Sequence, residues 1–294
     1  KRMREMMPLF AEIFSVHSEV SAAASVTMGA ITGLSLGMGK PGLDLRIAGG
    51  IGNVASASPS FALWDLSRIV ASSNELSAAF EKGIESIKKR IGSLKHQEFN
   101  ESFTRFIDQF GSRGPNEWEL RSRTWQTHPE LVFSIIDRMR MASDEHDPRR
   151  RHEEACSRSS EAINELRGMV QGDETAAGTL ELAATSSAVF IPAREQAKTI
   201  IVKVVHEVRL AALELGKRLE EVGKLENHSH IFMLQDKELE EAVTEGMSEI
   251  AAQREVEYLK LFKLTPPFWF NGIVPDVEHW HEKGEDLSTR RIVQ

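Results

Sequence analysis

The chain has 294 residues, of which 41% are hydrophobic, and a formal net charge of −8 at pH 7. This composition supplies enough apolar side chain for a substantial core and excludes an intrinsically disordered chain. The acidic balance argues against a general nucleic-acid binder, which must neutralise phosphates over a broad basic surface.

Residue usage predicts both the fold class and the compartment. Tyrosine occurs once and alternating runs of β-branched and aromatic residues are scarce, so we expect a mostly α, multi-helix fold, with the helices divided between two lobes. Cys156 is the only cysteine, which excludes an internal disulfide and favours a reducing, cytoplasmic setting.

The first forty residues raise the question of a membrane. Glutamates interrupt the apolar core that an export signal would need, but the stretch 20–39 has no charged residue. Because small residues fill most of that stretch, its transfer free energy is low, and we expect no membrane partner. A line of small residues recurs every four positions, which favours tight packing of a second helix over a gap for a flat ligand: Ser21, Ser25, Gly29, Gly33 and Gly37.

Several further helices are expected as scaffold. Lys40-Pro-Gly ends the first helix, and Ser58-Pro59 marks the start of a later one. Apolar spacing predicts helices over 73–94, 99–110, 131–139 and 153–170. The linker-like segment 171–178 suggests a division into lobes 1–170 and 179–294.

An unusual concentration of side chains lies in the segment 111–125. It holds three arginines, two glutamates and two tryptophans, which can stack and form ion pairs. A buried ion-paired loop that joins two helices and a loop that lines a substrate pocket explain it equally well.

The most informative stretch opens at Phe190. Pro192 suits the first turn of a helix that we expect to run to about Leu219, with one apolar face. Arg194 and Lys198 are one turn apart, and with Arg209 they flank that face, with Glu195 about a quarter-turn away. Two such cations beside an apolar groove suit a phosphate or carboxylate, although solvated, snorkelling side chains would have the same spacing.

The remainder is expected to be mixed. We predict a short extended piece over 226–234, a long helix over 236–261 and an irregular segment rich in proline and aromatic residues from Leu264. The pairs His228/His230 and His279/His281 have no third ligand at a recognisable spacing, so no metal site is expected.

These motifs resemble one enzyme group. Arg194-Glu-x-x-Lys198, Leu215-Gly-Lys-Arg-Leu219 and Gly111-x-Arg-Gly-x-x-Glu117 are similar to motifs of the dikinase-type phosphotransferases related to phosphoenolpyruvate synthase. Within that group the chain is most similar to the rifampin phosphotransferases, in their central helical domain that binds the acceptor substrate. The resemblance runs from about Leu43 through Val277 and includes the glycine-rich turn at 49–54.

The resemblance implies a mechanism shared between domains. Members carry an ATP-grasp domain before this region and a swivelling domain with a phosphohistidine after it, which are the expected partners, and they use ATP and Mg²⁺. This fragment would then bind neither cofactor and hold no catalytic residue. Arg194 and Lys198 would neutralise the transferring phosphoryl group. Glu195, Arg113 and Glu117 would line or support the acceptor pocket.

Two other functions fit the same residues. One is a non-catalytic α-helical interaction scaffold. The other is the linker domain of a pyruvate or phosphoenolpyruvate dikinase, whose acceptor chemistry lies in a separate barrel. Among small-molecule acceptors, an antibiotic hydroxyl, pyruvate and another small alcohol all remain open, because pocket shape decides between them.

Overall fold

The computed structural model describes residues 2–51, 57–90 and 96–284, and nearly all of its regular structure is helical. The expected mostly α, multi-helix fold is therefore confirmed. Contacts divide the chain into one unit of residues Lys1–Val208 and a second of Arg209–Gln294. We describe each unit by itself; the lobe division expected at 171–178 stays a prediction.

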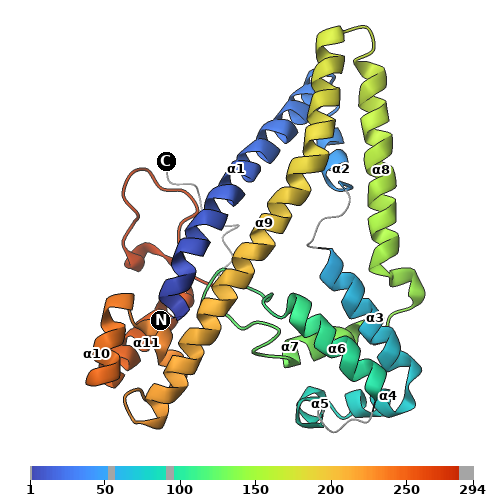
Figure 1. Ribbon diagram of the computed structural model, residues 1–294. Coiled ribbons are helices and arrows are strands. Elements are labelled where there is room, and N and C mark those ends of the chain that lie inside the picture. Colours follow the sequence, from blue (N-terminus) through green and yellow to red (C-terminus); the bar gives the residue numbers. More distant parts are fainter. Residues whose placement is uncertain (1, 52–56, 91–95, 285–294) are drawn as a thin grey trace. The chain divides into compact units, whose positions relative to one another are not determined.

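The first unit contains most of the helices, and α9 continues from it into the second (Figure 1). In chain order its elements are α1 (Arg2–Gly37), α2 (Leu43–Ala48), α3 (Ser58–Ser72), α4 (Asn74–Glu81), α5 (Ile84–Arg90), α6 (Gln97–Phe110), α7 (Glu130–Arg140), the 3₁₀ helix η2 (Asp144–His146), α8 (Pro148–Met169) and α9 (Glu174–Glu221).

One hydrophobic cluster is formed by the helices α3, α4, α5, α6 and α7. Phe80 of α4 meets Phe99 of α6 and Phe133 of α7 edge to face, with ring centroids 6.5 Å and 6.3 Å apart. Phe99, Phe106 and Phe110 are buried on one side of α6, which ends before Gly111 as its apolar spacing predicts. This cluster is scaffold.

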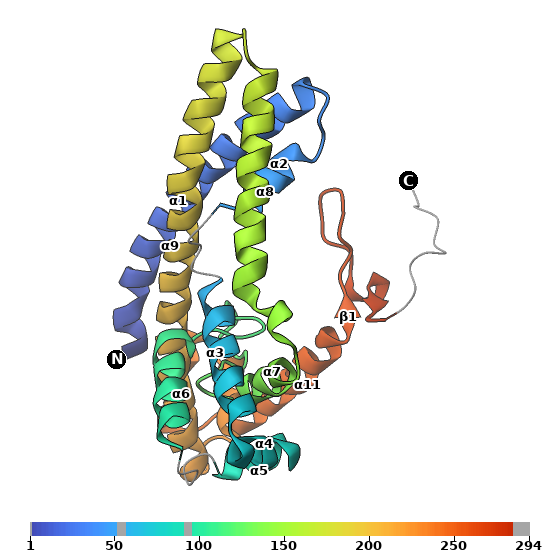
Figure 2. The same cartoon turned by 90° about the vertical axis from the view of Figure 1, so that its right-hand side faces the viewer.

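A second hydrophobic cluster joins α1, α2, α8 and α9. Its buried members include Ile31, Ile47, Leu166 and Leu180, one from each helix. Helices α8 and α9 run antiparallel from the turn at 170–173 (Figures 1 and 2). After α2, Gly50 lies so close to α8 that a Cβ there would be 2.1 Å from the carbonyl oxygen of Ala155, so only glycine fits.

Helix α1 corrects the expectation drawn from its small residues. Ser25, Gly29, Gly33 and Gly37 are exposed, and a Cβ at any of the three glycines would meet no atom within 4 Å. Another face of α1 packs instead, through residues such as Ala24 and Ile31. Burial of larger side chains yields more transfer free energy than burial of glycine, which explains why this face of α1 is buried and the glycine face is exposed.

The same helix passes a simple membrane test. By length and composition Arg4–Gly37 is apolar enough to span a bilayer, with a hydropathy of 1.4, and only 22% of the tested window is buried. A core helix or a leader passes the same test, so the absence of a membrane partner stays a prediction.

Helix α9 begins at Glu174, so the expected start at Phe190 is wrong. Pro192 lies inside the helix, where it removes one backbone donor at a cost of about 3 kcal/mol. Burial of Leu180 and Ala183 in the second cluster offsets that cost. The cap is Asp173, whose Oδ1 accepts a 3.0 Å hydrogen bond from the amide of Ala176.

Three other expected elements also differ. The helix expected over 73–94 is divided at Gly83, which has a φ of 92°, into α4 and α5. Gly246, with a φ of 91°, divides the helix expected over 236–261. The piece expected to be extended at 226–234 contains a 3₁₀ helix. Residues 52–56 and 91–95 lie outside the described part of the chain.

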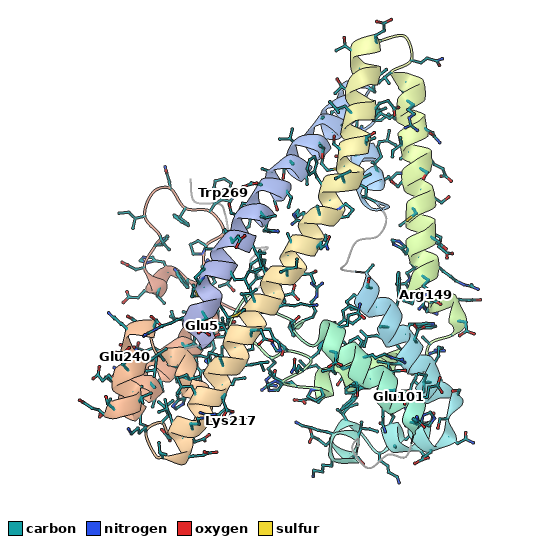
Figure 3. All side chains as sticks on the ribbon, in the orientation of Figure 1. Glu5, Glu101, Arg149, Lys217, Glu240 and Trp269 are labelled. Atoms are coloured by element: carbon teal, nitrogen blue, oxygen red, sulfur yellow. The ribbon has the colours of Figure 1, made fainter. Side chains whose placement is uncertain are left out.

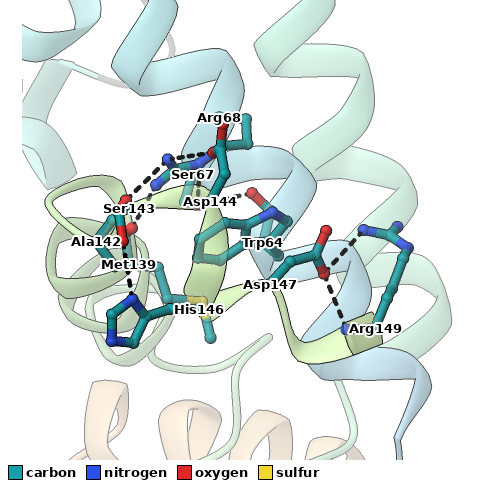
Figure 4. Close-up of polar contacts among 10 residues, drawn as sticks. All are labelled: Trp64, Ser67, Arg68, Met139, Ala142, Ser143, Asp144, His146, Asp147 and Arg149. Carbon is teal, nitrogen blue, oxygen red and sulfur yellow. Dashed lines mark hydrogen bonds and ion pairs between the residues drawn. The ribbon is translucent and has the colours of Figure 1, made fainter. Parts of the chain in front are cut away.

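An arginine joins α3 to the end of α7 (Figure 4). Arg68 donates hydrogen bonds to the carbonyl oxygens of Met139 at 2.5 Å and Ala142 at 3.0 Å, at and just beyond the end of α7. Its guanidinium also lies 4.1 Å from the ring centroid of Trp64. Arg149, labelled in Figure 3, lies at the start of α8 and donates to Asp65 of α3 at 2.7 Å.

The second unit contains the end of α9 and several short elements. They are η3 (His228–Met233), η4 (Asp236–Glu238), α10 (Leu239–Thr244), α11 (Ser248–Phe262), β1 (Leu264–Thr265), η5 (Val277–His279) and β2 (His281–Glu282). Strands β1 and β2 pair antiparallel, and the loop between them exposes Trp269 (Figure 3). The segment that follows α11 is largely irregular, as expected.

An ion pair organises the second unit. Arg254 of α11 donates to both carboxylate oxygens of Glu238, at 2.6 Å and 2.8 Å, and to the carbonyl of Met233 at 2.9 Å. The hydrogen bonds from Arg254, together with the amide of Gln235, lower the pKa of Glu238 to about 2. Because its contacts join α11 to the short elements before it within this unit, we treat the pair as structural.

Candidate functional site

The segment between α6 and α7, residues 111–129, is folded back on itself. The amide of Trp125 donates to the carbonyl of Arg113, and the amide of Gln126 to that of Gly111, both at 2.9 Å. A Cβ at Gly114 would be 2.3 Å from the carbonyl oxygen of Arg123, so this close approach requires glycine. We call this segment the arginine loop.

Two threonines fix the C-terminal side of the base of the arginine loop. Thr124 is buried, and its backbone amide donates to Oγ1 of Thr127 at 3.0 Å. Thr127 Oγ1 also lies 2.9 Å from Nδ1 of His128. Burial lowers the pKa of His128, and the nearby Arg123 and Lys88 lower it further against the opposing effect of Glu130. These contacts give the loop a defined shape at its base.

Glu117 of the arginine loop lies between two cations. Its Oε2 is 3.3 Å from Nε of Arg113, and its Oε1 is 3.2 Å from Nζ of Lys198 on α9. The side chains of Arg113 and Glu117 are each 12% exposed, and that of Lys198 is 28% exposed. The structure thus brings together residues of two motifs that the sequence singled out, the pair Arg113 and Glu117 and the residue Lys198.

The other two expected site residues form a separate pair. Nη1 of Arg194 lies 2.5 Å from Oε1 of Glu195, and the Arg194 side chain is 44% exposed. Arg194 and Lys198 are therefore neutralised by different carboxylates. Arg209, expected beside them on the flank, is instead fully buried in the second unit.

Two residues of α1 complete this region; sequence reasoning assigned no site role to His17 and named Ser21 only as a packing position. The ring of His17 lies 6.2 Å from that of Trp118, the neighbour of Glu117. Nδ1 of His17 and Oγ of Ser21 are buried atoms with no hydrogen-bond partner among the described residues. Their four-residue spacing places them on one face of α1, and the contact with Trp118 shows that His17 faces the arginine loop.

A cavity of about 210 Å³ lies among α1, the end of α2, α8 and α9. Its lining includes Ile31, Gly50, Ser159 and Ser187. Ser159 donates to the carbonyl of Ile47 at 2.7 Å, whereas the buried hydroxyl of Ser187 has a weak 3.9 Å contact with the sulfur of Met28. Among the described residues the walls carry no charged side chain, so the cavity suits a largely apolar group.

The cavity and the cations share one side of α9. Ser187, Ile191, Arg194 and Lys198 follow one another at steps of four, three and four residues, which keeps them on one helical face. At about 1.5 Å per residue, Arg194 lies about 10 Å and Lys198 about 16 Å beyond Ser187 along the axis. The two cations therefore follow the cavity along one face of α9.

Metal ligation finds no support within residues 2–51, 57–90 and 96–284. No group of three or more histidine, cysteine, aspartate or glutamate side chains converges there. Of the histidine pairs noted in the sequence, His228 forms a 2.9 Å contact with Glu220.

Comparison with known families assigns the chain to a class. A family described as the rifampicin phosphotransferase fourth domain matches residues 15–195, which is more than half of the sequence. The chain belongs to this family, so it is a helical domain related to phosphotransferases, and the expected membership is confirmed. The match includes Arg113, Glu117 and Arg194 but ends before Lys198. No curated protein matches the chain.

Proposed function

We propose that this chain binds the acceptor substrate of an ATP-dependent phosphotransferase. The acceptor's apolar part lies in the cavity, and its hydroxyl extends along α9 to Arg194 and Lys198. The observation that carries the proposal is that an uncharged cavity and two cations share one helical face.

The cations have a defined role in this proposal. A phosphoryl group in transfer spreads negative charge over its oxygens, and fixed cations stabilise that charge where water is partly excluded. The donor is a phosphohistidine on a mobile domain, which is charged with ATP and Mg²⁺ at an ATP-grasp domain. The chain's own contribution is to position the acceptor hydroxyl and neutralise charge.

The lining of the cavity favours one class of acceptor. The family description names rifampicin, a large apolar molecule with hydroxyl groups, and uncharged walls suit such a molecule better than pyruvate. Since about 210 Å³ is less than a drug-sized ligand fills, only part of the acceptor enters the cavity. The rest lies along α9 towards the arginine loop.

A titration of the 294-residue chain with rifampicin tests the proposal. Ala184 lines the cavity, so Ala184→Leu fills space that the acceptor needs and is expected to weaken binding about tenfold or more. Thr185→Leu is the matched control, because Thr185 is an exposed neighbour on the same helix. Equal affinity of the two variants would contradict the cavity as the acceptor site, and absence of binding to the unchanged chain would favour a structural scaffold.

A further inference from the structure

We propose that Glu117 is an internal anion occupying a two-cation site formed by Arg113 and Lys198, and that this site receives a ligand's phosphoryl group when Glu117 withdraws. The inference rests on the proposed function for the source of that phosphoryl group. It adds Arg113 as a binding residue and makes the Glu117 carboxylate a competitor of the ligand.

The geometry is that of a bound anion. Two cations from different elements contact one carboxylate, Arg113 at Oε2 and Lys198 at Oε1. An edge of a phosphoryl group presents two oxygens to donors in a similar way, so both groups suit the same pair of cations. Glu117 thus stands where a ligand's oxygens would stand.

The contacts are long for charged partners. Distances of 3.3 Å and 3.2 Å exceed the 2.7–2.9 Å that is usual when a cationic nitrogen donates to a carboxylate. A phosphate dianion carries more charge than a carboxylate, so it competes with Glu117 for these two cations. The site is shielded but not sealed, because the Lys198 side chain remains 28% exposed.

Withdrawal of Glu117 needs no movement of the backbone. The turn 115–118 is fixed by a 3.2 Å bond from the amide of Glu119 to the carbonyl of Asn116, and the base of the loop by the bonds of Trp125 and Gln126. The carboxylate therefore leaves the cations by rotation of the Glu117 side chain between its rotamers. The backbone at Arg113 stays in place.

Withdrawal has a measurable cost in affinity. When only a fraction of molecules has the site open, the apparent affinity falls by that fraction, so a site open in about one molecule in ten binds about tenfold more weakly. Removing the charge of Glu117 while keeping its shape abolishes this competition. Glu117→Gln is therefore expected to bind phosphate about tenfold more tightly.

The test is a titration of the 294-residue chain with inorganic phosphate at low salt, in which binding is measured by calorimetry or phosphorus NMR. Glu119→Gln is the matched control, because it removes the same charge from the same loop at a residue that bonds Asn116 at 3.0 Å. The proposal predicts tighter binding for Glu117→Gln, little change for Glu119→Gln, and loss of the gain when Lys198→Met or Arg113→Met is added. Unchanged or weaker phosphate binding by Glu117→Gln overturns the proposal. So does a gain in phosphate affinity that remains after Lys198→Met and after Arg113→Met.

A second variant covers the case in which Glu117→Gln does not fold. Glu117→Asp keeps the charge but shortens the side chain, which draws the carboxylate away from Lys198 and is expected to raise phosphate affinity by a smaller factor. No rise with that variant overturns the proposal. Because the readout uses no acceptor, failed rifampicin binding with a positive phosphate result would reject the acceptor proposal alone.

Discussion

Nε2 of His206 on α9 lies 2.9 Å from Oε1 of Gln126 at the base of the arginine loop. His206 is 3% exposed, so this hydrogen bond joins the loop to α9 in a buried setting. Together with Lys198 and Glu117 it gives the loop two attachments to the same helix.

Loss of the buried contact should reduce stability. We expect Gln126→Ala to lower the free energy of unfolding by about 1–3 kcal/mol, since a buried hydrogen bond is broken. Chemical denaturation of the 294-residue chain measures it. Gln97→Ala removes an exposed bond to Glu101 and should change stability by about 0.5 kcal/mol at most. Equal effects of the two substitutions would show that His206 does not hold the loop.

The two cations of α9 should affect turnover more than folding. Under the proposed function, in a phosphotransferase that contains this domain, Arg194→Ala or Lys198→Ala is expected to reduce turnover about ten- to a thousandfold with little change in melting temperature. Lys203→Ala, on an exposed position of the same helix, is the control. Parallel losses of activity and melting temperature would identify structural ion pairs instead.

Arg113 and Glu117 should be coupled. A double-mutant cycle with Arg113→Met and Glu117→Gln is expected to give a coupling free energy of about 0.5–3 kcal/mol, because loss of one partner leaves the other charge poorly compensated. Thermal unfolding and acceptor affinity are both measured. Additive effects would mean that the two side chains do not interact, and coupling in stability alone would make the loop a structural clamp.

The ion pair of the second unit should produce a pH dependence. Hydrogen bonds from Arg254 and the Gln235 amide lower the pKa of Glu238 from 4.5 to about 2, so its stabilising contribution is present above about pH 4.5 and is lost as pH falls towards 2. Glu238→Gln should therefore be less stable than the unchanged chain at pH 7, and the difference should vanish near pH 2. A difference that is constant over this range would contradict the shift.

Local sequence patterns predicted the helices better than their ends. The phenylalanine spacing of α6 is a property of one helix, and the structure confirms it. Pro192 led to the wrong helix start because the local rule about proline was outweighed by burial of Leu180 and Ala183 earlier in the same helix. Gly83 and Gly246 divide helices whose apolar spacing continues across them.

The sequence supplied the charged residues of the candidate site, whose role stays a prediction, but not most of their contacts. Arg194, Lys198, Arg113 and Glu117 were recognisable from their spacing and family motifs. Local patterns do not encode contacts between residues that are far apart in sequence. Examples are the contacts of Glu117 with Lys198, of Trp118 with His17 and of Gly50 with α8.

The most direct measurement of the central claim is hydrogen–deuterium exchange of the 294-residue chain with and without rifampicin. The account predicts slower exchange of α9 amides between Ala184 and Lys198 and of those around Gly50, because the acceptor would cover that face and make local opening less frequent. Rifampicin binding that leaves these amides unchanged and protects another part of the chain would contradict it.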